Sequence, residues 1–325
     1  MATAVYTDFK IYNEEFHAGM WEGVVQAVNL LNAASRNTIR LVAKDQAGHY
    51  AKEAFLKPPS DIITRRDIAS TSAAIALKPT GGEIVTVKVN KKIGPIEYAL
   101  DAIKKAGENQ RVISFQLGQR IGQEKVKAYV NTALIAAEAA IEGQSNLVYD
   151  ATGQTTKTLG TAHMTQGLQL FGDQAERILT WALHSKPFFD LVREQVAGAV
   201  TNVADRVIYG AAPGTLNRPA LVTDASSLIN SASTNTYNVL GLVENAVVIT
   251  ESEQSEMVTE VVTGLENLVV RIQGEFAFNV GVKGFTWDVT NGGLNPTDAS
   301  LGTTTNWDKS VTEDKDLAGC RILVQ

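Results

Sequence analysis

The chain has 325 residues, and its 29 lysines and arginines against 35 aspartates and glutamates give a formal net charge of −6. Such a charge argues against a protein whose main function is to bind phosphate groups, because that function needs a concentrated basic surface. The hydrophobic share of 44% is ordinary for a globular protein, and the single cysteine, Cys320, excludes an internal disulfide framework. With no apolar run long enough for a bilayer and no signal-peptide pattern, we expect cytoplasmic synthesis and no membrane partner.

Residues 12–35 are predicted to form an amphipathic helix. The apolar residues of this stretch recur at spacings of three and four, as Phe16, Met20, Val24, Val28 and Leu31. The helix would give the N-terminal part of the chain one apolar face.

A long β-hairpin is predicted over residues 49–92. In IVTVKV the valines alternate with Thr86 and Lys88, and Gly81 and Gly82 are expected to supply the positive φ of the hairpin turn. An isolated two-stranded ribbon is at best marginally stable, and this one carries many apolar residues. It therefore needs a cover, which is either a neighbouring copy of the chain or the chain's own body.

A helical pair is predicted next, with the first helix in EYALDAIKKAGENQ and the second over about residues 111–142. Gly118 and Gly122 weaken the first half of the second helix by roughly 1 kcal/mol each, so this helix is expected to begin nearer Gln123. With a rise of 1.5 Å per residue, this helix would still be long enough to span a domain.

Residues 145–245 have the pattern of a compact mixed α/β domain. Helices are predicted over 162–183 and 186–197, and strands in VTNVADRVIYG and PALVTD. The chain returns to strand in AVVITES and is rich in strand over 267–289. The tail from Asn291 is predicted to be irregular and to end in a short strand, RILVQ.

The stretch LTWALHSKPFFDLV, residues 179–192, holds the residue types of a serine hydrolase. His184 and Ser185 are adjacent, however, and neighbours on regular structure point apart, so a serine hydrolase is the less favoured interpretation. The favoured one is a helix start with Ser185 as N-cap and Asp190 near the positive end of the helix.

Metal and cofactor sites are not predicted. The histidines, His17, His49, His163 and His184, are scattered, and neither a metal-ligand spacing nor a phosphate-binding glycine motif is present. We therefore expect no catalytic residues, no cofactor and no bound metal.

The order of these parts resembles the major capsid proteins of tailed bacteriophages. Three segments of the sequence are also similar to segments of this family: WALHSKPFFDLV, PGTLNRPALVTDASSLI and ENLVVRIQGEFAFNVGVKGFTWDVTNGGLNPTDASLGTTTNW. Asn217 stands where the family pattern has glycine. The resemblance implies an α+β fold with a long spine helix, an extended E-loop β-hairpin and a compact axial α/β domain. The implied division is an N-terminal arm (1–48), the E-loop (49–92), a peripheral domain (93–144 and 246–290), the axial domain (145–245) and a C-terminal extension (291–325).

The resemblance further implies a structural protein, not an enzyme, that self-assembles into hexamers and pentamers of an icosahedral head around double-stranded DNA. The partners it implies are other copies of the chain, a portal, a separate scaffolding protein, and a decoration or cement protein; the location it implies is the virion. Assembly is expected to be noncovalent and without cleavage of the chain. The alternatives are an encapsulin-like compartment shell and, less favoured, the serine hydrolase.

The charge is unevenly distributed along the chain. Residues 36–105 hold 13 Lys and Arg against 7 Asp and Glu, whereas residues 250–325 hold 5 against 12. This complementarity suggests either two differently solvated surfaces or copies that meet head to tail, basic region on acidic region. The candidate contacts between copies are Lys52, Lys57, Arg65, Arg66, Lys78, Lys88, Phe16 and Met20.

Overall fold

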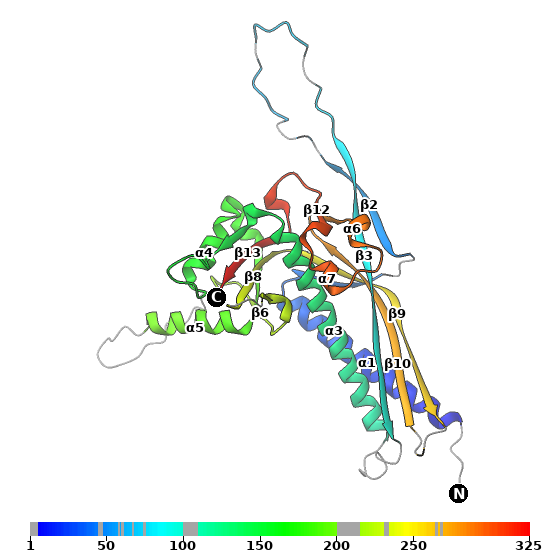
Figure 1. Ribbon diagram of the computed structural model, residues 1–325. Coiled ribbons are helices and arrows are strands. Elements are labelled where there is room, and N and C mark those ends of the chain that lie inside the picture. The colour runs from blue at the N-terminus through cyan, green and yellow to red at the C-terminus, as the bar shows by residue number, and fades with distance from the viewer. Residues whose placement is uncertain are drawn as a thin grey trace.

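The computed structural model contains two large β-sheets, one running alongside a long helix and the other near the C-terminal end of that helix (Figure 1). A β-hairpin projects from the body on one side, and the first and last described residues lie far apart. The residues that the structure describes are 6–44, 48–57, 59, 62–66, 68–73, 76–99, 110–199, 215–230, 234–263, 266 and 269–325.

The first sheet has five strands in the order β1-β9-β10-β3-β2. All neighbours are antiparallel except β1 and β9, which are parallel. Its centre is β10, which is paired along most of its length on both sides, so segments far apart in the chain depend on one strand. The strands are β1 (Ile39–Ala43), β2 (Tyr50–Lys57), β3 (Thr80–Ala99), β9 (Val247–Val262) and β10 (Val269–Val282).

Two long helices, α1 (Tyr6–Ala34) and α3 (Gln110–Glu142), cross each other beside this sheet (Figure 1). Phe16 and Met20 of α1 are buried in one cluster with Ile121 of α3 and with Val270 and Ile272 of β10. Farther along α3, the ring of Tyr129 packs edge-on against two phenylalanines of β10. The predicted amphipathic helix is thus confirmed, and its apolar face is covered by α3 and the sheet of the same chain.

Glycines allow the backbones of α1 and α3 to touch. Gly19 and Gly23 of α1 lie against α3, Gly118 and Gly122 of α3 lie against α1, and all four are buried. A Cβ at Gly122 would lie 2.6 Å from the carbonyl oxygen of Met20, and one at Gly118 would meet the backbone of α1 even more closely. The prediction that the helix begins near residue 123 was therefore wrong, because helix packing offsets the low helix propensity of these glycines.

The second sheet has the order β4-β13-β8-β5-β6, with β7 paired to β8. The last strand of the chain, β13, lies between two strands that come much earlier in sequence. The predicted terminal strand is confirmed, and it is central to this sheet. The strands are β4 (Val148–Asp150), β5 (Ile178–Leu183), β6 (Ala220–Val222), β7 (Ile229–Asn230), β8 (Thr236–Val243) and β13 (Gly319–Val324).

Two helices flank this sheet, α4 (Thr161–Gln169) and α5 (Ser185–Ala199). The predicted helix over 186–197 is confirmed, but the one over 162–183 was wrong beyond Gln169. Residues 178–183 form strand β5, in which Trp181 is fully buried. A short, continuously apolar run fits a buried strand as well as a buried helix, and sheet pairing decided between them.

Asn217 lies in the turn that precedes β6. Its φ is 62°, in the left-handed region that glycine adopts without strain. Asparagine tolerates this region better than most residues do. Asn217 therefore adopts a backbone conformation that is typical of glycine, the residue that the family pattern has at this position.

Short elements fill the space between the two sheets. Strands β11 (Phe285–Trp287) and β12 (Trp307–Lys309) pair with each other, and the rings of Trp287 and Trp307 pack at 5.0 Å. The short helices α6 (Val289–Gly292) and α7 (Asp298–Leu301) lie between them in the chain, so the tail is more regular than predicted. The 3₁₀ turns are Ser145–Leu147, Gly172–Arg177, Ser226–Leu228, Thr304–Asn306 and Asp314–Asp316.

The β-hairpin is confirmed as β2 paired with β3, but its turn was predicted in the wrong place. Gly81 and Gly82 lie inside β3, paired with Leu56 and Phe55, and the connection runs from residue 58 to residue 79. Strand β3 also extends to Ala99, which contradicts the start of the predicted first helix of the helical pair. Residues 100–109 of that helix and the predicted strand VTNVADRVIYG fall outside the described residues.

Gly118→Ala is expected to lower the free energy of unfolding by about 1–3 kcal/mol, because the added methyl group would force the two helix backbones apart. That loss exceeds the gain of about 1 kcal/mol that alanine brings to a helix interior. Urea denaturation followed by circular dichroism measures the difference. The matched control is Gly153→Ala, where an added Cβ meets nothing within 4 Å. A Gly118→Ala chain as stable as its parent would contradict this account of the crossing.

Candidate assembly surfaces

The connection between β2 and β3 carries apolar side chains that a single copy of the chain leaves in water. Its described part, residues 59, 62–66, 68–73 and 76–79, is here called the tip loop. Ile63 is 96% exposed and Ile68 is 89% exposed, and Ile62 and Leu77 are exposed as well. Figure 1 shows the loop extending away from both sheets. The chain's own body, one of the two predicted covers, therefore does not cover it.

The same loop and its strands carry basic side chains. Lys52 forms an exposed ion pair with Glu83 across the hairpin, at 2.6 Å. The side chains of Arg65, Arg66 and Lys78 are exposed, and Lys57 is half-buried. The hairpin therefore presents isoleucines and cations together.

Three of the predicted contact residues are buried within the copy that carries them. Phe16 and Met20 lie in the cluster between α1, α3 and β10. Lys88 is 3% exposed and reaches Glu253 of β9 at 2.6 Å. The expectation that these three side chains contact another copy is replaced by roles in the core of the subunit, because the sheet and its helices already surround them.

The basic and acidic regions of the sequence meet inside one copy. Strand β3 of the basic region lies beside β10 of the acidic region, and Lys88 of β3 is paired with Glu253 of β9. Lys91 of β3 also reaches Asp298 of α7 at 2.6 Å. Part of the charge complementarity seen in the sequence is thus satisfied within the subunit, and the cations of the tip loop remain for other contacts.

Three hollows of the described surface border β9. The largest of these three, about 820 Å³, is lined by Glu253, Glu256 and Glu275 together with two lysines of β3. Glu253 also borders a neighbouring hollow of about 310 Å³ beside α1, and Glu251 connects that hollow with a third of about 170 Å³. Trp21, 58% exposed, lines both of these smaller hollows. The first hollow therefore offers exposed carboxylates, and the two smaller ones offer an exposed aromatic ring.

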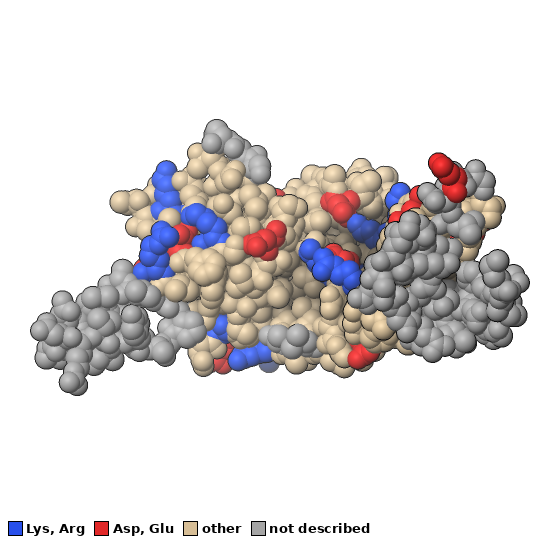
Figure 2. Space-filling model, turned by 90° about the horizontal axis from the view of Figure 1, so that it is seen from below, with Lys and Arg blue, Asp and Glu red and all other residues tan. Residues whose placement is uncertain are grey.

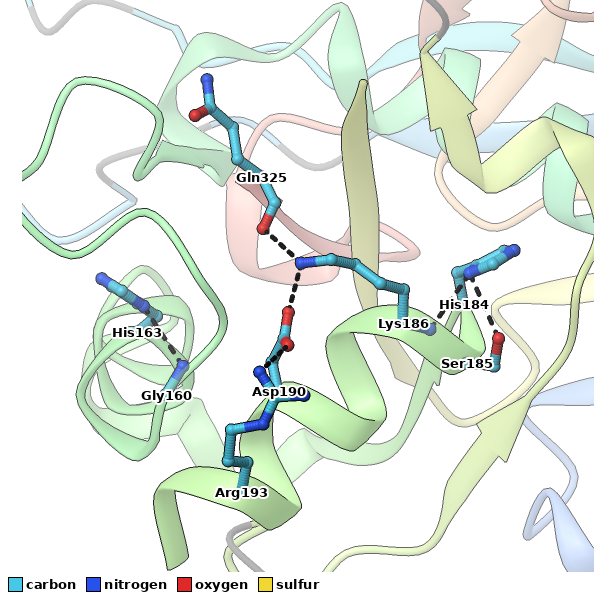
Figure 3. Close-up of polar contacts among 8 residues, drawn as sticks. All are labelled: Gly160, His163, His184, Ser185, Lys186, Asp190, Arg193 and Gln325. Carbon is cyan, nitrogen blue, oxygen red and sulfur yellow. Dashed lines mark hydrogen bonds and ion pairs between the residues drawn. The ribbon is translucent and has the colours of Figure 1, made fainter. Parts of the chain in front are cut away.

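The residues of the hydrolase-like stretch cap a helix instead (Figure 3). The backbone N–H of Lys186 donates to Nδ1 of His184 at 3.2 Å, and the carbonyl oxygen of His184 accepts from the N–H of Phe188. His184 is thus the N-cap of α5, and the prediction of Ser185 in that role was wrong by one residue. The capping bond occupies the lone pair of Nδ1 that would have to take the proton of the Ser185 hydroxyl, 3.4 Å away.

Lys186 and Asp190 hold the end of the chain against α5. Nζ of Lys186 donates to Asp190 at 2.5 Å and to the backbone oxygen of Gln325 at 3.1 Å. Arg193, from the next turn, lies 3.9 Å from the same carboxylate (Figure 3). These polar residues have a structural role around Gln325.

No group of three or more histidine, cysteine or acidic side chains within the described residues could hold a metal ion. Among those residues, no helix is both long and apolar enough to cross a membrane. Figure 2 shows that the described part of the lower face is mostly uncharged, with basic and acidic side chains interspersed. That part of the face offers no continuous basic patch for nucleic acid.

A long helix on a sheet, a projecting hairpin and a mixed α/β body closed by the last strand define a shell-forming coat protein of the tailed-phage class. The family model described as Major capsid protein 13-like matches residues 8–321. The chain belongs to this family, and the predicted resemblance is confirmed.

Solved structures share the fold at low sequence identity. The chain matches a structure of the cyanophage Pam1 capsid asymmetric unit with a TM-score of 0.50 and 10% identity, covering 88% of each chain. Chains from Mycobacterium phages Bobi and Adephagia match with a TM-score of 0.50 and 10% identity, covering 87% of each chain. No curated protein sequence gives a significant match.

The protein is therefore a structural, non-enzymatic component of a phage head. It forms a homo-oligomeric shell and is located in the capsid of the virion. The α+β fold class and the predicted function as a coat protein are confirmed, and the serine hydrolase is excluded.

His184→Ala is expected to lower the free energy of unfolding by about 1 kcal/mol, because α5 loses its capping acceptor. Ser185→Ala, in contrast, should change it by less than about 0.5 kcal/mol. Parallel urea titrations of the two variants test this order. If Ser185→Ala proves the more destabilising, Ser185 rather than His184 supports the helix start.

Proposed function

We propose that the chain assembles into the hexamers and pentamers of an icosahedral head around double-stranded DNA, and that the tip loop of each copy lies on the next copy. The single observation that carries the second part is the exposure of the loop isoleucines. Burial of an isoleucine side chain contributes about 1.5–3 kcal/mol, so a cover for Ile63 and Ile68 would stabilise the contact between copies.

The surface of β9 and β10 that carries Glu256 and Glu275 is the surface of the next copy that we propose for the loop. Its carboxylates, Glu256 and Glu275, are exposed and oppose the charge of Arg65 and Arg66. Val258, which is 67% exposed and lines a further hollow together with these two carboxylates, matches the loop isoleucines. Such a contact joins two different surfaces and is heterologous, which is the type that closes into rings.

We also propose the division of the chain that the family resemblance implies, with the arm at 1–48, the E-loop at 49–92, a peripheral domain at 93–144 and 246–290, and an axial domain at 145–245. Membership of the two sheets supports the separation of the axial domain from the other three parts, whose strands share the five-stranded sheet. The pairing of β13 with β4 and β8 supports assigning that strand of the 291–325 segment to the axial domain.

A portal, a separate scaffolding protein and a decoration or cement protein remain predicted partners, and synthesis in the host bacterial cytoplasm remains the predicted origin. DNA is proposed to be enclosed without sequence-specific binding. The net charge of −6 supports this, because an acidic wall does not hold the genome tightly.

An encapsulin-like compartment would share closed shells but would package protein cargo. Electron microscopy of purified particles, with nuclease digestion and gel analysis of their contents, separates the two functions. Large heads that contain DNA are expected; small shells filled with a single enzyme would overturn the proposed role.

Ile63→Asp is expected to abolish shell formation while the subunit still folds, because the substituted side chain is fully exposed in the isolated subunit but buried in the proposed contact. Negative-stain microscopy and sedimentation measure assembly, and circular dichroism measures folding. Lys127→Glu, an exposed charge reversal on α3, is the control and should assemble. Normal shells from Ile63→Asp would contradict the docking of the loop.

The double charge reversal Arg65→Glu with Arg66→Glu is expected to reduce the yield of shells about tenfold or more, and the further pair Glu256→Lys with Glu275→Lys should restore it. Rescue is expected because opposite charges again face each other across the contact. Sedimentation of assembly reactions at low and high salt gives the yield. Loss without rescue would place the basic loop on some other surface.

A further inference from the structure

A buried charged cluster joins the C-terminal end of α3 to the six-stranded sheet, and the proposed contacts between copies do not involve it. Glu138 and Glu142 lie one turn apart on α3, Arg321 lies on β13, and Asn238 lies on β8. Around them the contact between helix and sheet is made by small apolar side chains of α3, at Ala133, Ala136, Ala137 and Ala140. The cluster is thus the polar part of an otherwise apolar joint.

One guanidinium serves both carboxylates. Arg321 approaches Glu138 at 3.1 Å and Glu142 at 2.8 Å, and its Nε donates to the side-chain oxygen of Asn238 at 3.0 Å. The amide nitrogen of Asn238 in turn donates to Glu138 at 3.2 Å. Every member of the cluster is bonded to at least one other member, so a change of charge at one alters the bonding of all.

The charges in the cluster do not balance when both glutamates are ionised. Glu142 is partly exposed and can be solvated, but the Glu138 side chain is only 11% exposed, and those of Arg321 and Asn238 are buried. The charged groups that act on Glu138 are Arg321 and Glu142.

Among the described residues, the other elements packed on α3 and β13 add one neutral partner, Asn230 of β7, whose side-chain nitrogen donates to the side-chain oxygen of Asn238 at 3.5 Å. His163 of α4 accepts from the backbone N–H of Gly160, and Lys309 of β12 is paired with Asp314. Strands β7 and β8 and the 3₁₀ turns Ser145–Leu147 and Ser226–Leu228 contribute neutral side chains. Strand β4 carries Asp150, whose carboxylate bonds to Thr152, and α7 carries Asp298, which is paired with Lys91. The net charge of the cluster therefore depends only on the ionisation of its own members.

We propose that this cluster is a proton-operated joint between the spine helix α3 and the axial sheet. With both glutamates ionised it holds one surplus negative charge in a buried place. Uptake of one proton by Glu138 leaves a balanced pair of Arg321 and Glu142, and the helix is then held to the sheet more firmly. The joint lies inside one copy, so it does not depend on how copies meet.

The direction of the pH effect follows from the burial of Glu138. Burial raises the pKa of this carboxyl from 4.5 to about 7, an effect that Arg321 opposes and Glu142 reinforces. Between these two values the folded chain binds a proton that the unfolded chain does not. The stabilising effect of this proton is therefore fully present below pH 4.5, declines as the pH rises toward about 7, and is absent above it.

Hydrogen exchange of the full chain at pH 5.5 and pH 8.0, corrected for intrinsic exchange rates, tests the joint. The peptides to follow cover residues 134–142, 236–243 and 319–324, with β10 as the internal control. Because each pKa unit corresponds to a factor of ten in an equilibrium constant, protection in these peptides should be about tenfold or more lower at pH 8.0. The β10 peptides should not change to the same extent.

Glu138→Gln should remove this pH dependence, because the amide keeps the size of the side chain and carries no charge at either pH. Glu142→Gln, the comparison one turn away, should weaken the pH dependence without removing it, because the charge of Glu142 is lost but the burial of Glu138 remains. The proposal is overturned if Glu138→Gln retains the pH dependence or if Glu142→Gln alone removes it. Should Glu138→Gln not fold, the unmodified chain decides, since equal protection at both pH values overturns the proposal.

Discussion

The isoleucines of the tip loop lie in water in a single copy of the chain, and this incomplete burial is the constraint on which the proposed contact between copies depends. A body that covered them itself would leave a subunit with no apolar reason to associate. Ile63 and Ile68 are instead held at the end of a hairpin, away from both sheets, where a neighbour can cover them. In the contact that we propose, burial of these side chains by a neighbouring copy supplies free energy that the isolated subunit lacks.

The hairpin can project because its base is held rigidly. Strand β3 runs from the hairpin into the five-stranded sheet, beside β10. The sheet is supported by α3, and α3 is supported by α1 through a crossing at which glycines allow backbone contact. Ion pairs such as Lys88 with Glu253 fasten the strands from inside. The position of the loop is thus determined by packing far from the loop itself.

Sequence patterns predicted elements with strong periodicity or clear ends. The amphipathic arm, the hairpin, the spine helix and the helix after His184 were all predicted, because each depends on local spacing of apolar residues or on capping. Predictions failed where local signals were ambiguous. Residues 178–183 fit helix or strand equally, and Gly81 and Gly82 resemble a turn but lie within a strand. The candidate contacts were chosen by charge and apolar character, neither of which reveals burial, and the buried Lys88 was included for that reason.

The sequence by itself determined the order of arm, hairpin, long helix and α/β body, which follows from local propensities, and the resemblance of this order and of three segments to tailed-phage capsid proteins indicated the class of the protein. It also determined that the hairpin is both apolar and basic. Only the tertiary structure decided which of those side chains reach solvent, that Gly118 and Gly122 serve a helix crossing, and that β13 joins the sheet formed by much earlier strands. It alone brought Arg321 to Glu138, which is far away in the chain. Such contacts are set by the packing of whole elements, which no local window of sequence contains.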